Sequence, residues 1–83
     1  VMQRVPRNKV IQHPQEHEAF CAYLRQLRTN YGFTQAKVAQ ALNLSRPQYS
    51  ALESGRSMLT FDHLCGLSDF YKLELFELTA RRL

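Results

Sequence analysis

Two candidate helix-capping residues, Thr34 and Ser45, lie eleven positions apart near the middle of this 83-residue chain. A Ser or Thr just before an apolar-periodic segment marks a helix start, because its side-chain oxygen accepts hydrogen bonds from the unpaired amides of the first turn. The run Ser45-Arg46-Pro47-Gln48 also has the S-x-x-Q spacing of a capping box. Two starts this close leave room for about two turns of helix and one tight turn. The spacing therefore predicts two consecutive short helices.

Each predicted short helix has one apolar face. Val38, Ala39 and Leu42 recur at one-turn spacing in the first helix, and Tyr49 and Leu52 do so in the second. Both helices are shorter than the length at which isolated helices persist in water. We therefore expect other elements to hold the pair in place.

A longer helix is expected before this pair. Pro14 is well placed at a helix start, where its missing amide hydrogen is not needed. Apolar residues then repeat at intervals of four, three and four and form the stripe of an amphipathic helix: Phe20, Leu24, Leu27 and Tyr31. Gly32 is expected to end this helix.

Two more helices are expected after the pair. Thr60 and Asp62 indicate the start of a fourth helix. Its inward face is expected to contain Leu64, Leu67 and Phe70 or Tyr71. The apolar residues Leu75, Phe76 and Leu78 indicate a fifth helix. We therefore predict an all-α fold, with a compact five-helix domain over residues 14–83.

The composition fits a folded domain with a polyanionic partner, although charge alone is weak evidence. The chain is 45% hydrophobic and carries a net charge of +4, and basic side chains near phosphates displace condensed counterions. Cys21 and Cys65 form no C-x-x-C pair and are interpreted as reduced core residues. No apolar run approaches the roughly 20 residues that cross a bilayer, so we expect a cytoplasmic protein with no membrane partner.

From Leu24 to about Leu75 the chain resembles the Cro and lambdoid-repressor class of helix-turn-helix domains, which are phage repressors and small bacterial regulators. The resemblance rests on four segments in the family's order and spacing: Gly32-Phe33-Thr34-Gln35, Val38-Ala39, Leu44-Ser45 and Leu52-Glu53-Ser54-Gly55. It implies a lambda-repressor-like DNA-binding domain from a bacterium or phage, located in the cytoplasm at the nucleoid.

The resemblance implies that the helix beginning near Ser45 reads bases in the major groove through Arg46, Pro47, Gln48 and Ser50. Arg46 is the principal candidate, because a guanidinium can bond both major-groove acceptors of guanine. A solvated surface arginine or a phosphate clamp is the alternative for Arg46. For Gln48, the capping-box role competes with base contact.

The resemblance also implies contacts to the DNA backbone and one structural ion pair. The candidate backbone residues are Thr34, Gln35, Ser45, Arg56 and Ser57. For Arg56, a solvated loop charge is an equally good interpretation. In relatives the acid of the L-E-x-G motif pairs with an arginine of the first helix, which here implies a pair between Glu53 and Arg28.

Four residues depart from the family pattern. Asn43 stands where glycine is customary, although asparagine tolerates positive φ. Pro47 offers no donor to bases and could instead touch a thymine methyl group, and Ala51 replaces a position that is often polar. Tyr49 is larger than the usual aliphatic residue and is interpreted as core packing. Because Pro47 and Ala51 leave this helix fewer groups that can read bases, affinity would depend more on phosphate contacts and DNA shape.

Residues 1–13 lack helical periodicity and contain Arg4, Arg7 and Lys9, with Pro6 preventing a regular helix. They are predicted to form a basic arm or an edge strand. Three interpretations stay open: an arm along the DNA backbone or in a minor groove, an extended segment that pairs with another subunit, and a disordered tail.

The run from His13 to His17 formally matches the H-x-x-E-H motif of inverted zinc peptidases. A catalytic zinc needs both histidines on one face of a formed helix, whereas His13 precedes Pro14 and is expected at or before the first turn. Surface histidines around a helix start are the simpler interpretation. We expect no metal site, no cofactor and no catalytic residues.

The sequence therefore predicts a sequence-specific regulator of transcription, a repressor or autoregulator, that binds double-stranded DNA and is not an enzyme. One helix reads too few bases for genomic selectivity, so we expect a homodimer on a near-palindromic operator. Leu75, Phe76 and Leu78 are candidates for its interface, with core packing as the equal rival. Two other functions remain open: an antitoxin that also binds a toxin, and a protein-interaction module that has lost DNA binding.

Overall fold

The computed structural model describes residues 13–80, which form five α-helices joined by short links. In chain order these are α1 (Pro14–Asn30), α2 (Gln35–Ala41), α3 (Arg46–Glu53), α4 (Phe61–Tyr71) and α5 (Leu75–Ala80). No strand occurs within residues 13–80, and the predicted all-α fold is confirmed. Apart from His13, the predicted arm over residues 1–13 lies outside the described residues.

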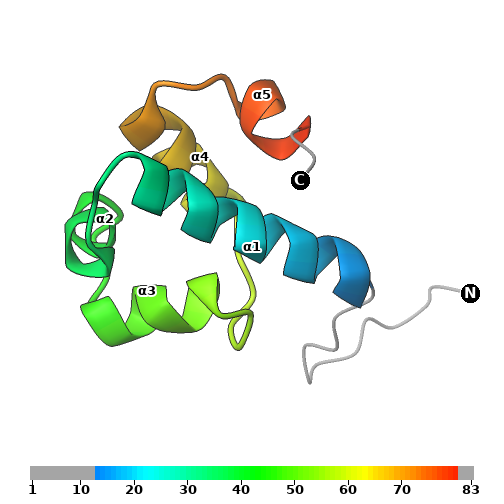
Figure 1. Ribbon diagram of the computed structural model, residues 1–83, viewed down its shortest axis with the longest axis horizontal. Helices are drawn as coiled ribbons and strands as arrows, with labels where there is room; N and C mark the ends of the chain where they lie inside the picture. The colour runs from blue at the N-terminus through cyan, green and yellow to red at the C-terminus, as the bar shows by residue number, and fades with distance from the viewer. Residues whose placement is uncertain (1–12, 81–83) are drawn as a thin grey trace, which may run out of the picture.

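The longest helix, α1, runs through the middle of the fold (Figure 1). α3 lies on one side of α1 and α5 lies on the other (Figure 1). α2 and α3 pack against each other, α3 also packs on α1, and α5 packs on α4. Neighbouring helices therefore hold the two short helices in place, as their lengths require.

The caps predicted from the sequence are present. Thr34 Oγ1 accepts a hydrogen bond from the Lys37 amide at 3.1 Å, and Ser45 caps α3. Thr60 Oγ1 accepts from the His63 amide at 3.1 Å, while His63 Nδ1 accepts from the Thr60 amide at 3.0 Å. The role of His63 was not predicted, because Glu or Gln is the usual residue at this position of a capping box.

Backbone segments with positive φ separate the first three helices. Gly32, with φ of 77°, follows α1 as predicted. Asn43, with φ of 63°, lies in the turn between α2 and α3. Asparagine is one of the few non-glycine residues that adopt this conformation readily. The turn therefore keeps the geometry that a glycine would give it.

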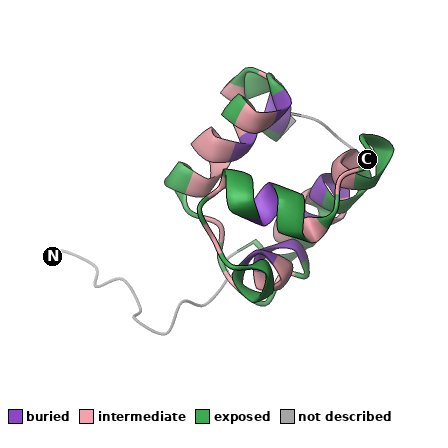
Figure 2. Cartoon of the chain, turned by 90° about the vertical axis from the view of Figure 1, so that its left-hand side faces the viewer, coloured by how far each residue is buried: buried purple, intermediate pink, exposed green. Residues whose placement is uncertain are grey.

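The core is formed by residues from all five helices, and buried positions alternate with exposed ones along them (Figure 2). The largest fully buried side chains are Tyr49, Leu24, Leu67, Leu78 and Val38. Gly66 lies inside α4, where an added Cβ would come within 2.5 Å of the Leu42 side chain. A residue without a side chain therefore lets α4 approach Leu42 closely.

The prediction that Tyr31 belongs to the apolar stripe of the first helix is wrong. α1 ends at Asn30, so Tyr31 leaves the helical stripe and is 52% exposed. Its ring stacks on Phe33 with the centroids 5.6 Å apart and meets the ring of Tyr71 at 5.2 Å. Tyr31 therefore covers an aromatic cluster from outside instead of filling the core.

The remaining apolar predictions are confirmed in part. Cys21 is buried and Cys65 is half-buried, and both are free thiols. Leu78 is fully buried, whereas Phe76 is 76% exposed. The segment around residues 75–78 was open to two interpretations, a dimer interface or core packing. Core packing is confirmed for Leu78 and is wrong for Phe76. None of the described helices is long and apolar enough to cross a membrane.

Candidate nucleic-acid interface

The third helix has one buried face and one exposed end. Tyr49, Leu52 and Glu53 are buried, and they bind α3 to the rest of the domain. Arg46, Pro47 and Gln48 are exposed, and Ser50 is half-buried. The first turn of α3 therefore projects its side chains into solvent, while the helix is anchored at its second half.

A reciprocal capping box fixes this first turn. Ser45 Oγ accepts a hydrogen bond from the Gln48 amide at 3.2 Å, and Gln48 Oε1 accepts from the Ser45 amide at 2.8 Å. Pro47 lies in the first turn, where no intrahelical partner for an amide exists. Arg46 is left exposed beside this box, at the first position of the helix.

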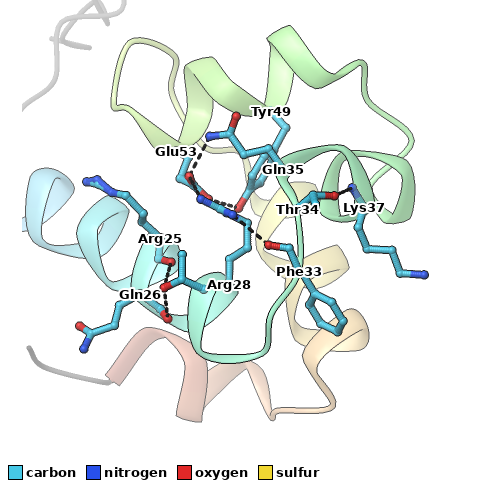
Figure 3. A network of polar contacts seen from close by, with 10 residues as sticks. Arg25, Gln26, Arg28, Phe33, Thr34, Gln35, Lys37, Tyr49 and Glu53 are labelled. Carbon is cyan, nitrogen blue, oxygen red and sulfur yellow. Dashed lines mark hydrogen bonds and ion pairs between the residues drawn. The ribbon is translucent and has the colours of Figure 1, made fainter.

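A buried carboxylate connects α3 to α1 and α2 (Figure 3). Glu53 Oε2 accepts from Arg28 Nε at 2.8 Å, and Glu53 Oε1 accepts from Arg28 Nη2 at 3.1 Å. Gln35 Nε2 donates to Glu53 Oε1 at 2.9 Å, and the Tyr49 hydroxyl donates to Glu53 Oε2 at 2.9 Å. Charge-assisted bonds of this kind are short and strong. One carboxylate therefore sets the relative positions of the three helices.

Arg28 extends the same network to the link before α2. Its Nη1 donates to the Phe33 carbonyl oxygen at 2.9 Å, so the guanidinium is bonded on two sides (Figure 3). The hydrogen bond to Glu53 raises the pKa of Arg28 above its ordinary value. Arg28 therefore stays charged and acts as a structural residue within this part of the fold.

The ionisation of Glu53 reflects two opposing effects. Burial raises the pKa of its carboxyl group, whereas hydrogen bonds from Arg28, Gln35 and Tyr49 lower it, and the net pKa lies below the ordinary value of 4.5. Burial and the neighbouring Glu53 charge also raise the pKa of the Tyr49 hydroxyl. At neutral pH the carboxylate is therefore ionised and the tyrosine acts as a donor.

The residues expected at the DNA backbone do not all share one environment. Thr34 and Ser45 are exposed at the starts of α2 and α3, and Gln35 is half-buried with its amide turned toward Glu53. Arg56 is exposed after α3, where its Nε donates to Ser54 Oγ at 2.9 Å. Ser57, in the same loop, is half-buried. Gln35 is the first residue of α2, and its side chain joins the start of that helix to Glu53.

Sequence reasoning missed two members of the Glu53 network. The sequence predicts Tyr49 only as core packing, although a buried tyrosine normally needs a partner for its hydroxyl and Glu53 follows one helical turn later. Gln35 was assigned only on the resemblance, and no periodicity in the sequence relates it to Glu53. Lys37 is a further exposed basic residue in the first turn of α2, and no motif in the sequence indicates it (Figure 3).

The histidine and cysteine residues near the start of α1 form no larger cluster in the described residues. His17 Nε2 lies 3.8 Å from Cys21 Sγ, one helical turn away. Cys21 Sγ also donates to the Leu52 carbonyl oxygen at 3.4 Å, and burial raises the pKa of its thiol. Within residues 13–80 no group of three or more His, Cys, Asp or Glu residues is placed to hold a metal ion.

Comparison with known proteins identifies one similarity. A family model described as helix-turn-helix matches residues 24–78, which run from the middle of α1 into α5. No curated protein and no solved structure matches the chain. The matched region contains α2, α3 and all four residues of the Glu53 network.

Proposed function

The chain belongs to the Cro and lambdoid-repressor type of helix-turn-helix family, a family of DNA-binding regulators, and from this premise we propose that it reads the major groove with α3 and represses transcription. The observation that carries this proposal is the exposure of Arg46, Pro47 and Gln48 on a helix whose other face is anchored in the core. In the helix-turn-helix docking mode, the N-terminal residues of the second helix contact base edges.

Arg46 is assigned the main base contact. Its guanidinium is exposed and presents a fork of N–H donors, which matches the N7 and O6 acceptors of guanine. Thr34, Ser45 and Arg56 are assigned to phosphates, because they are exposed at helix starts or in the loop that follows α3. Phosphate contacts position the protein, and base contacts specify the sequence.

A homodimer is the assembly that this function requires. Two half-sites one helical turn apart, about 34–36 Å, need both copies of α3 on the same side of the pair. Phe76 lies on α5, across α1 from α3 (Figure 1), so a pair joined there would hold its α3 helices far apart. Met58 and Phe61 are 43% and 66% exposed and follow the C-terminal end of α3. We assign the dimer contact to these two residues.

Selection of bound sequences from a random duplex pool tests the proposal with the full chain. We expect near-palindromic sites, and affinity that falls steeply with salt as counterions are released. The Arg46→Ala variant should lose its preference at one base pair of each half-site, with a cost of about 1–3 kcal/mol. If no duplex is enriched above the starting pool, the proposed function is wrong. If the selected sites are not altered by Arg46→Ala, the assignment of Arg46 is wrong.

A further inference from the structure

The orientation of the Gln48 amide determines which bases it can read. A backbone amide can only donate a hydrogen bond, so the Gln48 atom 2.8 Å from the Ser45 nitrogen must be the amide oxygen. This bond turns the oxygen back toward the start of its own helix. The amide nitrogen, with two hydrogens, is the end of Gln48 that remains for a ligand, and the side chain is exposed.

The other outward polar groups of this turn are donors as well. The Arg46 guanidinium has five N–H donors and no acceptor. Ser45 Oγ already accepts from the Gln48 amide, which leaves its hydroxyl hydrogen to donate. Pro47 has no polar side-chain atom. The first turn of α3 therefore presents an apolar ring and, apart from the second lone pair of Ser45 Oγ, a set of donors.

Base pairs differ in what they offer to such a surface. In the major groove guanine presents two adjacent acceptors, N7 and O6. Adenine presents one acceptor beside the N6 donor, thymine one acceptor beside its methyl group, and cytosine a donor. Glutamine usually pairs with adenine by donating to N7 and accepting from N6 at the same time. The capping bond occupies one of the two lone pairs of the Gln48 oxygen and fixes that oxygen at the Ser45 amide, so the pairing with adenine needs the oxygen to leave the cap.

On the basis of the proposed function, we infer that the first turn of α3 reads guanine at both Arg46 and Gln48, and that the capping box prevents Gln48 from selecting adenine. The capping box therefore acts in specificity as well as in stability. Each half-site should contain two guanines on the base pairs that face this turn.

The variant Gln48→Glu separates reading from capping. Glutamate is the other residue that completes a capping box, so its carboxylate can still accept from the Ser45 amide. The remaining oxygen replaces the two donor hydrogens with an acceptor. Thermal unfolding of this variant should match that of the unchanged chain, which shows that the cap is retained. The added negative charge weakens binding to all sequences alike, so a change in base preference reports the exchange of donors for an acceptor.

The test is selection from a random duplex pool with the unchanged chain, Gln48→Glu and Arg46→Ala. The base pair read by each residue is the one whose preference changes in its variant. We expect guanine over adenine by about tenfold at the Gln48 position. In Gln48→Glu that preference should change to cytosine, whose N4 group donates, while the Arg46 position keeps guanine.

Three results would overturn the inference while DNA binding stands. Adenine at the Gln48 position would mean that the capping bond opens on DNA. Sites that are the same for Gln48→Glu and the unchanged chain would mean that Gln48 does not read a base. A Gln48→Glu variant whose preference changes to a base other than cytosine would mean that the exchange of donors for an acceptor does not determine the choice. Absence of binding to any duplex would instead reject the proposed function itself, and the inference with it.

Discussion

The carboxylate of Glu53 in α3 accepts two hydrogen bonds from the guanidinium of Arg28 in α1, at 2.8 and 3.1 Å. The Arg28 side chain is 13% exposed and the Glu53 side chain is 3% exposed, so water screens the attraction between them little. Because Gln35 and Tyr49 bond the same carboxylate, the pair is part of a network that joins three helices.

Breaking the pair from either side should destabilise the fold. Arg28→Ala leaves Glu53 buried without its cation, and Glu53→Ala leaves Arg28 without its anion. Each variant should lower the free energy of unfolding by about 3–5 kcal/mol, measured by urea denaturation. The double variant should cost less than the sum of the two, because no uncompensated charge remains. A double variant whose loss equals the sum would show that the two residues do not act as a pair.

Stability should fall in acid because of Glu53. The pKa of its carboxyl group is below the ordinary 4.5 in the folded state. The stabilisation is therefore complete above about pH 4.5 and is lost as the pH falls through the folded-state pKa. Urea denaturation at a series of pH values should show this decline in the unchanged chain and a shallower one in Glu53→Gln. Equal slopes for both proteins would mean that other carboxyl groups cause the decline.

Removing one hydroxyl group should have opposite consequences at two buried tyrosines. The Tyr49 hydroxyl donates to Glu53 at 2.9 Å, so Tyr49→Phe should cost about 1.5–3 kcal/mol. The Tyr71 hydroxyl is buried with no hydrogen-bond partner among residues 13–80, and burial raises its pKa to about 12. Tyr71→Phe should cause no loss and a gain of up to about 1 kcal/mol. Thermal denaturation of both variants checks the prediction, and a large loss in Tyr71→Phe would contradict it.

The turn between α2 and α3 should tolerate glycine better than alanine. Asn43 has φ of 63°, a conformation that costs an ordinary L-residue about 1–2 kcal/mol. Asn43→Ala should therefore lower stability by about 1 kcal/mol, while Asn43→Gly should remain within about 0.5 kcal/mol of the unchanged chain. Chemical denaturation of the two variants compares them directly. If alanine is tolerated as well as glycine, the turn does not require the positive φ.

Two exposed phenylalanines provide a matched test of the proposed dimer. Phe61 is 66% exposed at the start of α4, and Phe76 is 76% exposed on α5. Phe61→Ala should shift the protein toward monomer in sedimentation equilibrium and weaken binding to a palindromic duplex. Phe76→Ala should leave both unchanged. If the effects are reversed, the dimer forms through α5 and its α3 helices cannot meet one duplex as proposed.

The positions of the helices could be predicted because local signals determine them. Thr34, Ser45 and Thr60 each start a helix, and their side-chain oxygens act within the same turn of the chain. The positive φ at Asn43 also follows from its own chemistry. Such signals depend on neighbours three or four residues away, which a single sequence displays directly.

The Glu53 network could not be derived from such signals alone. Arg28 and Glu53 are 25 residues apart and were paired only through the resemblance, and Gln35 joins Glu53 from 18 residues away. Their contact depends on how α1, α2 and α3 cross, which no short-range spacing encodes. Tyr31 was misplaced for a related reason: one residue of helix length decides whether a side chain remains on the apolar stripe.

The anchor of α3 and its outward turn are separate along the helix, since Tyr49 and Glu53 bind the interior while Arg46 and Pro47 meet solvent. Under the proposed function, new operator preferences could be installed by exchanging those two outward residues, with the interior left untouched. Gln48 is the exception, since any replacement there must still accept the amide hydrogen of Ser45. In an engineered regulator built on this domain, positions 46 and 47 could therefore be varied freely, whereas position 48 would be restricted to Gln or Glu.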